Sequence, residues 1–285
     1  MIANSFEYSA PGSLKEALEL LADGAGKPLA GGMSLIPMMK LRLANPDHLV
    51  DIGRLAELNY IREEGGELRI GASATHCDVE SSPLLLGKCP LIAETASYIG
   101  DIQVRNKGTI GGSVAHADPA ADYPAALHAL EAKIVVSSSE GSRTITTPEF
   151  FLDTFTTALE PGEIVTEVIV PVDAGLTGTS YQKFLQPASG FAIVGVAARV
   201  RQSGGKFTMV RVGVTGLAGN CYRAENVEAA LEGKEATEAN ILAAAALVAE
   251  GVDASSDLHA SAEYRSHLAA VYTARALRSA LSRSA

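Results

Sequence analysis

Two paired-glycine segments constrain the fold of this chain more than any other feature of its sequence. The first, Ala30-Gly31-Gly32-Met33-Ser34-Leu35-Ile36, follows a short predicted strand and leads into a predicted helix. The second, Thr109-Ile110-Gly111-Gly112-Ser113, lies in a glycine-rich stretch before another predicted helix. Glycine has no Cβ, so its backbone can approach a ligand closely, and the free amide hydrogens at a helix start attract phosphate. Together the segments predict a pyrophosphate gripped from both sides, with the hydroxyls of Ser34, Thr109 and Ser113 as further donors.

A glycine pair taken alone has a simpler interpretation, because it is also the ordinary composition of a tight turn. The first segment is therefore weak evidence of a ligand when it is considered without the second. Neither segment matches the Rossmann pattern G-x-G-x-x-G or the Walker pattern G-x-x-x-x-G-K, and neither pattern occurs elsewhere in the chain. If a dinucleotide binds, it binds to a different architecture.

The order of predicted elements indicates an α+β chain of two domains. Strands and helices are interleaved up to a loop-rich break at 171–179, and three strand-like runs and then alanine-rich helices follow it. Leu14, Ala17, Leu18 and Leu21 recur at helical spacing after a capping box of Ser13 and Glu16, which predicts a first helix that ends near 24–26. The pattern further predicts strands at 27–30, 48–52, 60–64, 67–70, 133–138, 143–147, 164–170, 180–185, 191–202 and 206–216, and helices at 34–42, 77–81, 91–99, 119–130, 224–231, 238–249 and 261–281. The strand at 164–170 alternates apolar and polar residues, which is typical of one buried face. The domains are expected to cover 1–175 and 176–285, the second with a three-stranded antiparallel sheet plus helices.

Composition excludes several classes of function. The net charge is −10 at 285 residues, and the Lys and Arg residues are scattered, which argues against a nucleic-acid partner. The cysteines Cys77, Cys89 and Cys221 are odd in number and lack C-x-x-C spacing, so neither a disulfide framework nor a metal or iron–sulfur site is predicted. The longest apolar stretch, 241–249, is too short to span a bilayer, and no secretory signal is visible. A cytoplasmic location is expected by default.

The two segments and their flanks resemble the flavin loops of a known family. Residues 30–40 are similar to the first flavin loop of the FAD-binding, or medium, subunit of molybdenum hydroxylases, and residues 100–113 with 117–122 resemble the second loop. This is the family of aerobic carbon monoxide dehydrogenase and of the flavin domain of xanthine dehydrogenase. Residues 181–184 and 187–192 resemble the start of its C-terminal domain, so the resemblance covers essentially the whole chain. It implies an FAD-binding domain of vanillyl-alcohol-oxidase type, with α/β subdomains at roughly 1–55 and 56–175, and a smaller α+β C-terminal domain.

The resemblance also assigns cofactor-binding roles. Residues 30–36 are expected to wrap the pyrophosphate and approach the flavin, residues 109–113 to hold the pyrophosphate from the other side, and Asp122 to accept a hydrogen bond from a ribose or ribityl hydroxyl. The full predicted set is Ala30, Gly31, Gly32, Met33, Ser34, Leu35, Ile36, Ile99, Thr109, Ile110, Gly111, Gly112, Ser113, Asp118, Asp122, Ile164, Val165, Lys183 and Phe191. No catalytic acid or base and no metal ligand is predicted.

Simpler interpretations of several of these residues stay open. Asp122 is also suited to the N-terminus of the following helix. Ile164, Val165 and Phe191 would look the same as strand core residues, and Lys183 the same as a surface lysine.

Three residues raise questions of their own. Met33 stands where many relatives carry a polar side chain, and Ile99 stands where animal xanthine dehydrogenases have a phenylalanine near the adenine. Aliphatic packing is therefore expected at residue 99. His116 is expected to make a polar contact near a helix and not to act as a base.

The resemblance implies a division of labour between subunits. A large molybdenum-pterin subunit would oxidise the substrate, a small subunit would relay electrons through two [2Fe–2S] clusters, and FAD in this chain would pass them to an external acceptor. A dimer of such heterotrimers is expected. Two alternatives remain: a flavin-free assembly or nucleotide-binding module of the same fold, and a self-sufficient flavin oxidase. A yellow colour excludes the first alternative, and assays of the lone chain test the second.

Overall fold

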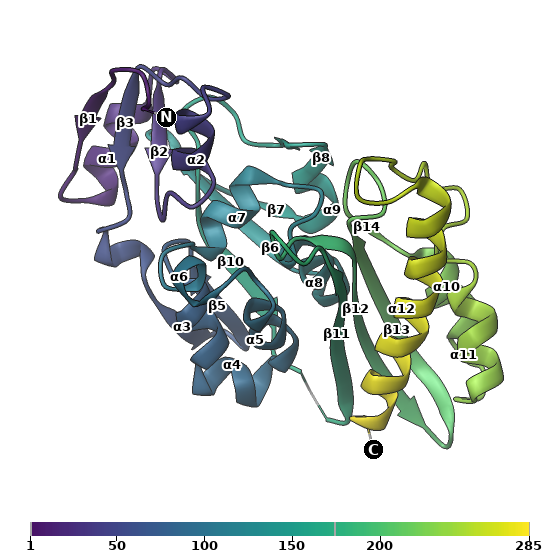
Figure 1. Cartoon of the computed structure of the whole chain (residues 1–285). Helices are drawn as coiled ribbons and strands as arrows, with labels where there is room; N and C mark the ends of the chain where they lie inside the picture. The colour runs from purple at the N-terminus through teal and green to yellow at the C-terminus, as the bar shows by residue number, and fades with distance from the viewer. Residues whose placement is uncertain (1, 174, 285) are drawn as a thin grey trace.

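A small parallel sheet forms the N-terminal lobe in the computed structural model, which describes residues 2–173 and 175–284 (Figure 1). The strands β1 (Glu7–Ser9), β2 (Gly26–Leu29) and β3 (His48–Asp51) pair in the order β1-β3-β2. Two helices connect them, α1 (Leu14–Leu21) and α2 (Leu35–Lys40). In α1, residues 17, 18 and 21 fall on one helical face, and this face is buried against Val50 and Ile52. The first glycine segment is the connection from β2 to α2.

The second sheet is antiparallel and has β10 at its centre. Its order is β4-β5-β10-β6-β7, and its strands are β4 (Ile61–Glu64), β5 (Glu67–Gly71), β6 (Lys133–Ser138), β7 (Gly141–Thr146) and β10 (Ile164–Pro171). The expectation of one buried face for β10 is wrong, because every residue from Ile164 to Val170 is buried. The polar residues have partners inside the core. Glu167 lies 2.6 Å from Arg69 and 2.7 Å from the Tyr60 hydroxyl, and Thr166 hydrogen-bonds to Ser137.

Short helices surround this sheet. They are η1 (Ala56–Leu58), α3 (His76–Ser81), α4 (Pro83–Lys88), α5 (Pro90–Ser97), α6 (Ile102–Arg105), α7 (Ile110–His116), α8 (Tyr123–Leu130) and α9 (Thr147–Phe150), with a small hairpin of β8 (Phe151–Asp153) and β9 (Thr156–Thr157). The helix expected at 119–130 begins only at Tyr123, because Asp118 closes a turn before it. The second glycine segment forms the start of α7, a helix that the glycine pattern did not predict. All eight residues of α8 are buried.

The C-terminal domain is an antiparallel sheet covered by helices on both faces. Its strands are β11 (Thr177–Leu185), β12 (Ala192–Ser203), β13 (Lys206–Thr215) and β14 (Tyr222–Arg223), and its helices are α10 (Glu225–Leu231), α11 (Glu238–Ala245) and α12 (Ala262–Ser282). The three predicted strands are present, and the two-residue β14 adds a fourth. One face packs on α12, and the other receives α8 from the preceding domain (Figure 1). The sheet is therefore buried on both sides, with Ala197 in one core and Val196 in the other.

Two further observations concern sequence expectations. Cys89 and Cys221 are buried free thiols, and Cys77 is a partly exposed one. Across residues 2–173 and 175–284, the longest helix is α12, and no helix there combines the length and the hydropathy that crossing a membrane requires.

Candidate functional site

The first glycine segment lies directly against the residues that precede the second. A Cβ built on Gly31 would stand 1.8 Å from the carbonyl oxygen of Lys107 and 2.9 Å from the Cα of Gly108. No side chain fits at these distances, so glycine at position 31 is what allows the first segment to pack against this stretch. Lys107 and Gly108 lead directly into the second segment. The structure therefore brings together the two segments that the sequence predicted to face one ligand.

The first segment presents a row of unused backbone donors. Gly32 has the left-handed φ of +71°, and the first helical bond of α2 runs from Ile36 N to Gly32 O at 3.0 Å. Within the described part of the chain, the amides of residues 31–35 donate to no protein acceptor, and the Ser34 side chain caps no amide. Consecutive amides without partners are suited to an anionic phosphate. Met33 and Ile36 are exposed beside them.

The second segment differs, because the protein already uses its first amides. Ile110 N donates to Ala74 O at 3.0 Å, Gly111 N donates to Ala72 O at 2.9 Å, and Gly112 N donates to the Thr109 hydroxyl at 3.1 Å. The expectation of free amides at this helix start is wrong for these three. Gly111 allows the close packing, since a Cβ there would lie 2.4 Å from the Cβ of Ala72. Gly112, which is exposed, and the partly buried Ser113 are left to face a ligand.

The two predicted aspartates follow α7. The Asp118 carboxylate accepts from Ala120 N at 2.8 Å and so shapes a turn. Asp122 is buried and caps no amide of α8. It accepts hydrogen bonds from the Tyr181 hydroxyl at 2.5 Å and from Lys183 Nζ at 2.9 Å. Burial raises the pKa of Asp122 to about 6, and Lys183 and Tyr181 act in the opposite direction.

Lys183 is not a surface lysine, because its side chain is fully buried. Besides its ion pair with Asp122, Nζ donates to Tyr98 O at 3.0 Å. The ring of Tyr98 also packs edge-on against Tyr181, with the centroids 5.5 Å apart. Lys183 therefore links the C-terminal domain to the segment just before Ile99. Direct contact of Asp122 or Lys183 with a cofactor stays a prediction.

The structure separates the remaining predicted residues into two groups. Ile164 and Val165 lie in the hydrophobic cores, as strand core residues do. Ile99 is partly buried against a core, whereas Phe191 is 44% exposed. Gly100 and Gly190, the chain neighbours of Ile99 and Phe191, lie close together across the domain boundary: a Cβ on Gly190 would lie 3.5 Å from the Cα of Gly100.

The His116 side chain makes no hydrogen bond among the described residues, so the polar contact expected of it is not found, although the charges of Asp118 and Lys27 act on its ring. Its ring packs against Phe155 with the centroids 5.1 Å apart, and burial lowers its pKa. A polar role beside the second segment belongs instead to His76, whose Nδ1 lies 3.2 Å from the Tyr123 hydroxyl. A Cβ on Gly108 would lie 2.6 Å from His76 Nε2, so the His76 ring packs against the residue that precedes the second segment. Sequence reasoning missed His76, since nothing in its local pattern indicates the contact.

Sequence reasoning also missed Tyr181 and Thr215. Tyr181 and Lys183 alternate along β11 and so point to the same face, which the strand pattern could have indicated. Thr215 ends β13, and its hydroxyl lies 2.8 Å from both Pro119 O and Ala121 O. No local signal announces that contact, because the two segments are far apart in sequence.

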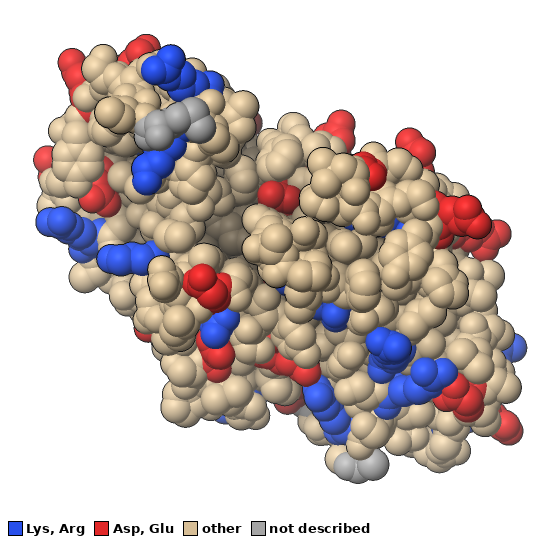
Figure 2. Space-filling view, viewed as in Figure 1, with Lys and Arg blue, Asp and Glu red and all other residues tan. Residues whose placement is uncertain are grey.

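The surface around the glycine segments is hollowed. Figure 2 shows a recess between the N-terminal lobe and the rest of the molecule. A separate apolar hollow of about 370 Å³ lies on the lobe itself, and Ile36 of the first segment is part of its wall, together with Ile2, Ala3, Phe6, Tyr8, Leu29, Met39, Lys40 and Leu49. The first segment therefore borders an apolar surface.

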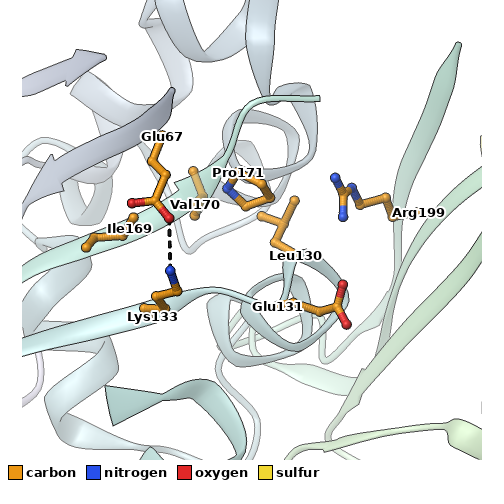
Figure 3. A pocket seen from close by; sticks show the side chains of 8 residues that line it. All are labelled: Glu67, Leu130, Glu131, Lys133, Ile169, Val170, Pro171 and Arg199. Atoms are coloured by element: carbon orange, nitrogen blue, oxygen red, sulfur yellow. Dashed lines mark hydrogen bonds and ion pairs between the residues drawn. The ribbon is translucent and has the colours of Figure 1, made fainter. Parts of the chain in front are cut away.

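A smaller cavity of about 190 Å³ lies elsewhere, at the domain boundary (Figure 3). Thr166 is linked to the second segment through Ala72, which donates to Thr166 O and accepts from Gly111 N, and the strand from Thr166 to Pro171 in this cavity spans roughly 16 Å at the usual rise of a β-strand. The cationic side chains that line the cavity are in ion pairs, Lys133 with Glu67 at 3.0 Å and Arg199 with Asp173 at 2.7 Å. This cavity is therefore not part of the candidate site.

Comparison with known proteins identifies the family of this site. Residues 4–173 match the family described as the FAD binding domain in molybdopterin dehydrogenase, and residues 179–280 match the CO dehydrogenase flavoprotein C-terminal domain. The chain belongs to the FAD-binding medium subunits of the molybdenum hydroxylases, which confirms the resemblance of the two glycine segments. It is thus an oxidoreductase subunit with an FAD-binding domain, and the unpaired amides of the first segment fit that cofactor.

Relatives with different names cover the whole chain. The carbon monoxide dehydrogenase medium chain of Hydrogenophaga pseudoflava is 42% identical over 287 residues, 100% of both chains. The glyceraldehyde dehydrogenase medium chain of Sulfolobus acidocaldarius is 38% identical over 98% of this chain and 99% of its own. A solved structure of the Hydrogenophaga carbon monoxide dehydrogenase, which lacks the Mo-pyranopterin moiety, superposes with a TM-score of 0.96 over 99% of each chain at 44% identity.

Proposed function

We propose that this chain carries electrons, through bound FAD, from the [2Fe–2S] clusters of a partner subunit to an external acceptor. The observation that supports the proposal is the row of unpaired amides at residues 31–35, held against the second glycine segment by the contact of Gly31 with Lys107. FAD would supply the redox chemistry, while the protein binds and orients it.

Specific residues would hold the cofactor. The amides of residues 31–35 would donate to the pyrophosphate, because these consecutive donors at the start of a helix have no protein acceptor among the described residues. Gly112 and Ser113 would face it from the other side through the exposed surface of Gly112 and the hydroxyl of Ser113, since the amides of both residues already donate to Thr109. None of these residues needs to transfer a proton, so no catalytic residue is proposed in this chain.

The partners would be a large molybdopterin subunit and a small iron–sulfur subunit, assembled as a dimer of heterotrimers. Medium chains named for carbon monoxide and for glyceraldehyde are both about 40% identical to this one over its whole length. A chain that tolerates such different substrates is not expected to contact them. The substrate would therefore be determined by the large subunit.

Flavin content of the purified holoprotein is the first test. We expect one FAD per chain, a yellow colour, and recovery of FAD after its removal and readdition. A colourless protein that takes up no FAD would favour a flavin-free module and contradict the proposal. Turnover of an organic substrate by the lone chain would instead indicate a self-sufficient oxidase.

A glycine pair provides a sharper test. In Gly31→Ala the new Cβ must displace Lys107, which separates the segments, and losing two or three hydrogen bonds to phosphate weakens FAD binding about a hundredfold. The control is Gly87→Ala in α4, where the new Cβ meets no atom within 4 Å outside its chain neighbours and the backbone of its own helix, and its FAD affinity should equal that of the wild type. Thermal unfolding of both apoproteins checks that they fold. Equal FAD affinity in a folded Gly31→Ala variant would contradict the assignment.

A further inference from the structure

The turn between α7 and α8 is held by the backbone and hydroxyl donors of the C-terminal domain. The Thr215 hydroxyl lies 2.8 Å from both Pro119 O and Ala121 O, and Gly216 N donates to Pro119 O at 2.8 Å. Ala192 N donates to Ala120 O at 3.2 Å. Consecutive carbonyl groups of the turn thus depend on partners from another domain. If such a partner is lost, water cannot replace it at a buried carbonyl, and the observed conformation of the turn is destabilised.

The same turn ends in a carboxylate with two further partners from the C-terminal domain. Asp122 receives hydrogen bonds from the Tyr181 hydroxyl and Lys183 Nζ, both from β11. Because Asp122 and Lys183 are both buried, either charge alone would be strongly unfavourable. Tyr181 and Lys183 therefore hold the end of the turn, as Thr215 holds its middle.

The three donating side chains are grouped by the architecture of the sheet. Lys183 on β11 is opposite Gly195 on β12, and Gly195 is opposite Thr215 on β13. A Cβ on Gly195 would lie 2.3 Å from the Tyr181 hydroxyl oxygen and 2.9 Å from Thr215 Cγ2. The missing side chain in the middle strand makes the space that the Tyr181 hydroxyl occupies. The Tyr181 hydroxyl thus lies over Gly195 and donates to Asp122.

This turn is continuous with the second glycine segment. Helix α7 begins with that segment and is only seven residues long, and it ends at Ala117 in the left-handed conformation, immediately before Asp118. Because α7 is one short helix, we expect a shift of the turn to move Gly112 and Ser113 as well.

We propose that Tyr181 and Thr215, with Gly195 between them, are positioning residues for FAD: they act through the turn at 118–122 and set the placement of the second glycine segment. This inference rests on the proposed function, because it concerns the binding of FAD. It assigns to the C-terminal domain a share of the cofactor affinity without requiring that these residues touch FAD.

The test measures FAD affinity in the full chain after removal of single hydrogen-bond donors. Thr215→Val keeps the shape of the side chain and removes its hydroxyl, and we expect the Kd of FAD for the apoprotein, followed by flavin fluorescence, to rise about tenfold. Thr215→Ser restores the donor and should return the Kd to near the wild-type value. Tyr181→Phe should behave as Thr215→Val does. Hydrogen exchange of the amides at 120 and 121 should accelerate in both weakened variants.

Two control variants separate positioning from general loss of stability. Thr273→Val removes a hydroxyl that is buried in the same domain and has no hydrogen-bond partner among the described residues, so its FAD affinity should not change. Val248→Ala weakens the core beneath the sheet without touching the turn, and should lower the midpoint of thermal unfolding but not FAD affinity. If Val248→Ala raises the Kd as much as Thr215→Val, the role is merely structural and the inference is overturned. Wild-type affinity in both Thr215→Val and Tyr181→Phe also overturns it, whereas a wild-type chain that binds no FAD refutes the proposed function itself.

Discussion

The two glycine segments share one sequence pattern but solve different problems. In the first, Gly31 permits contact with Lys107, and the amides that follow stay without protein partners. In the second, Gly111 permits contact with Ala72, and the amides that follow are consumed by the protein. The first segment thus offers free amide donors to a ligand, whereas the amides of the second segment are hydrogen-bonded within the protein and hold that segment in place. A Gly-Gly pair therefore shows that a backbone comes close to something, but not whether that neighbour is ligand or protein.

The largest expected effect concerns the buried support behind the second segment. Lys183→Met leaves the Asp122 carboxylate buried without its cation, which should lower the free energy of unfolding by about 3–5 kcal/mol. Urea unfolding at neutral pH measures it. The control is Lys15→Met, which removes an exposed i,i+4 pair with Glu19 and should cost under about 0.5 kcal/mol. Equal losses in the two variants would mean that the buried pair gives no special support.

The next effect is a dependence of stability on pH that His76, which packs beside the second segment, should produce. Burial, reinforced by the charge of Arg105, lowers the pKa of His76 to about 4 from the ordinary 6.5. The unfolded chain binds the proton more readily, so the stability that neutral His76 allows is present above pH 6.5 and is lost as the pH falls toward 4. The loss amounts to about 3 kcal/mol at the acid end. In His76→Gln this part of the pH dependence of unfolding should disappear, and an unchanged slope would contradict the assignment.

A matched pair within the second segment should give a smaller difference. Gly111→Ala forces a Cβ against Ala72 in a packed interior, and should destabilise the fold by about 2 kcal/mol. In Gly112→Ala the new Cβ lies 2.9 Å from the Thr109 hydroxyl, a side-chain atom that can move, so the fold should lose at most the roughly 1 kcal/mol of that helix cap while FAD affinity falls. Chemical unfolding and FAD titration of both variants separate packing from binding. The assignment fails if Gly112→Ala unfolds more easily than Gly111→Ala.

The smallest effect compares the two helix starts. Thr109 caps α7 through Gly112 N, so Thr109→Ala should cost about 1 kcal/mol of stability. Ser34 makes no such bond at the start of α2, so Ser34→Ala should stay within about 0.5 kcal/mol of the wild type. Thermal unfolding of the apoproteins is sufficient to detect the difference. A larger loss in Ser34→Ala would reverse the comparison.

Much of the fold could be predicted because local patterns agree with it. Helical spacing identified the buried face of α1, and the strand-like runs between turn residues located most strands. Where the prediction was wrong, distant contacts decided the outcome. β10 is buried on both faces because Arg69 and Tyr60 satisfy Glu167, and no pattern within the strand reveals these partners. Helix α7 was missed because glycine disfavours helices, while tertiary contact with Ala72 stabilises this one.

The candidate site was predictable to the same degree. The two segments could be paired because each pattern is local and both resemble one family. The surroundings of Asp122 could not, since Tyr181 and Lys183 come from the other domain and their alternation on β11 names no partner. Direct contacts of Ile164 and Val165 with a cofactor stay predictions, as do the domain boundaries near residues 55 and 175.

The grip of Thr215 on the turn has a consequence for biosynthesis. A growing chain exposes both glycine segments long before β13 has been made, yet on our inference the placement of the second segment depends on a hydroxyl from the end of that strand. On the ribosome, an incomplete chain would hold FAD loosely, and firm loading would wait until residue 216 had emerged and the C-terminal sheet had closed. Cofactor acquisition would then follow completion of the chain, so truncated products would not sequester flavin.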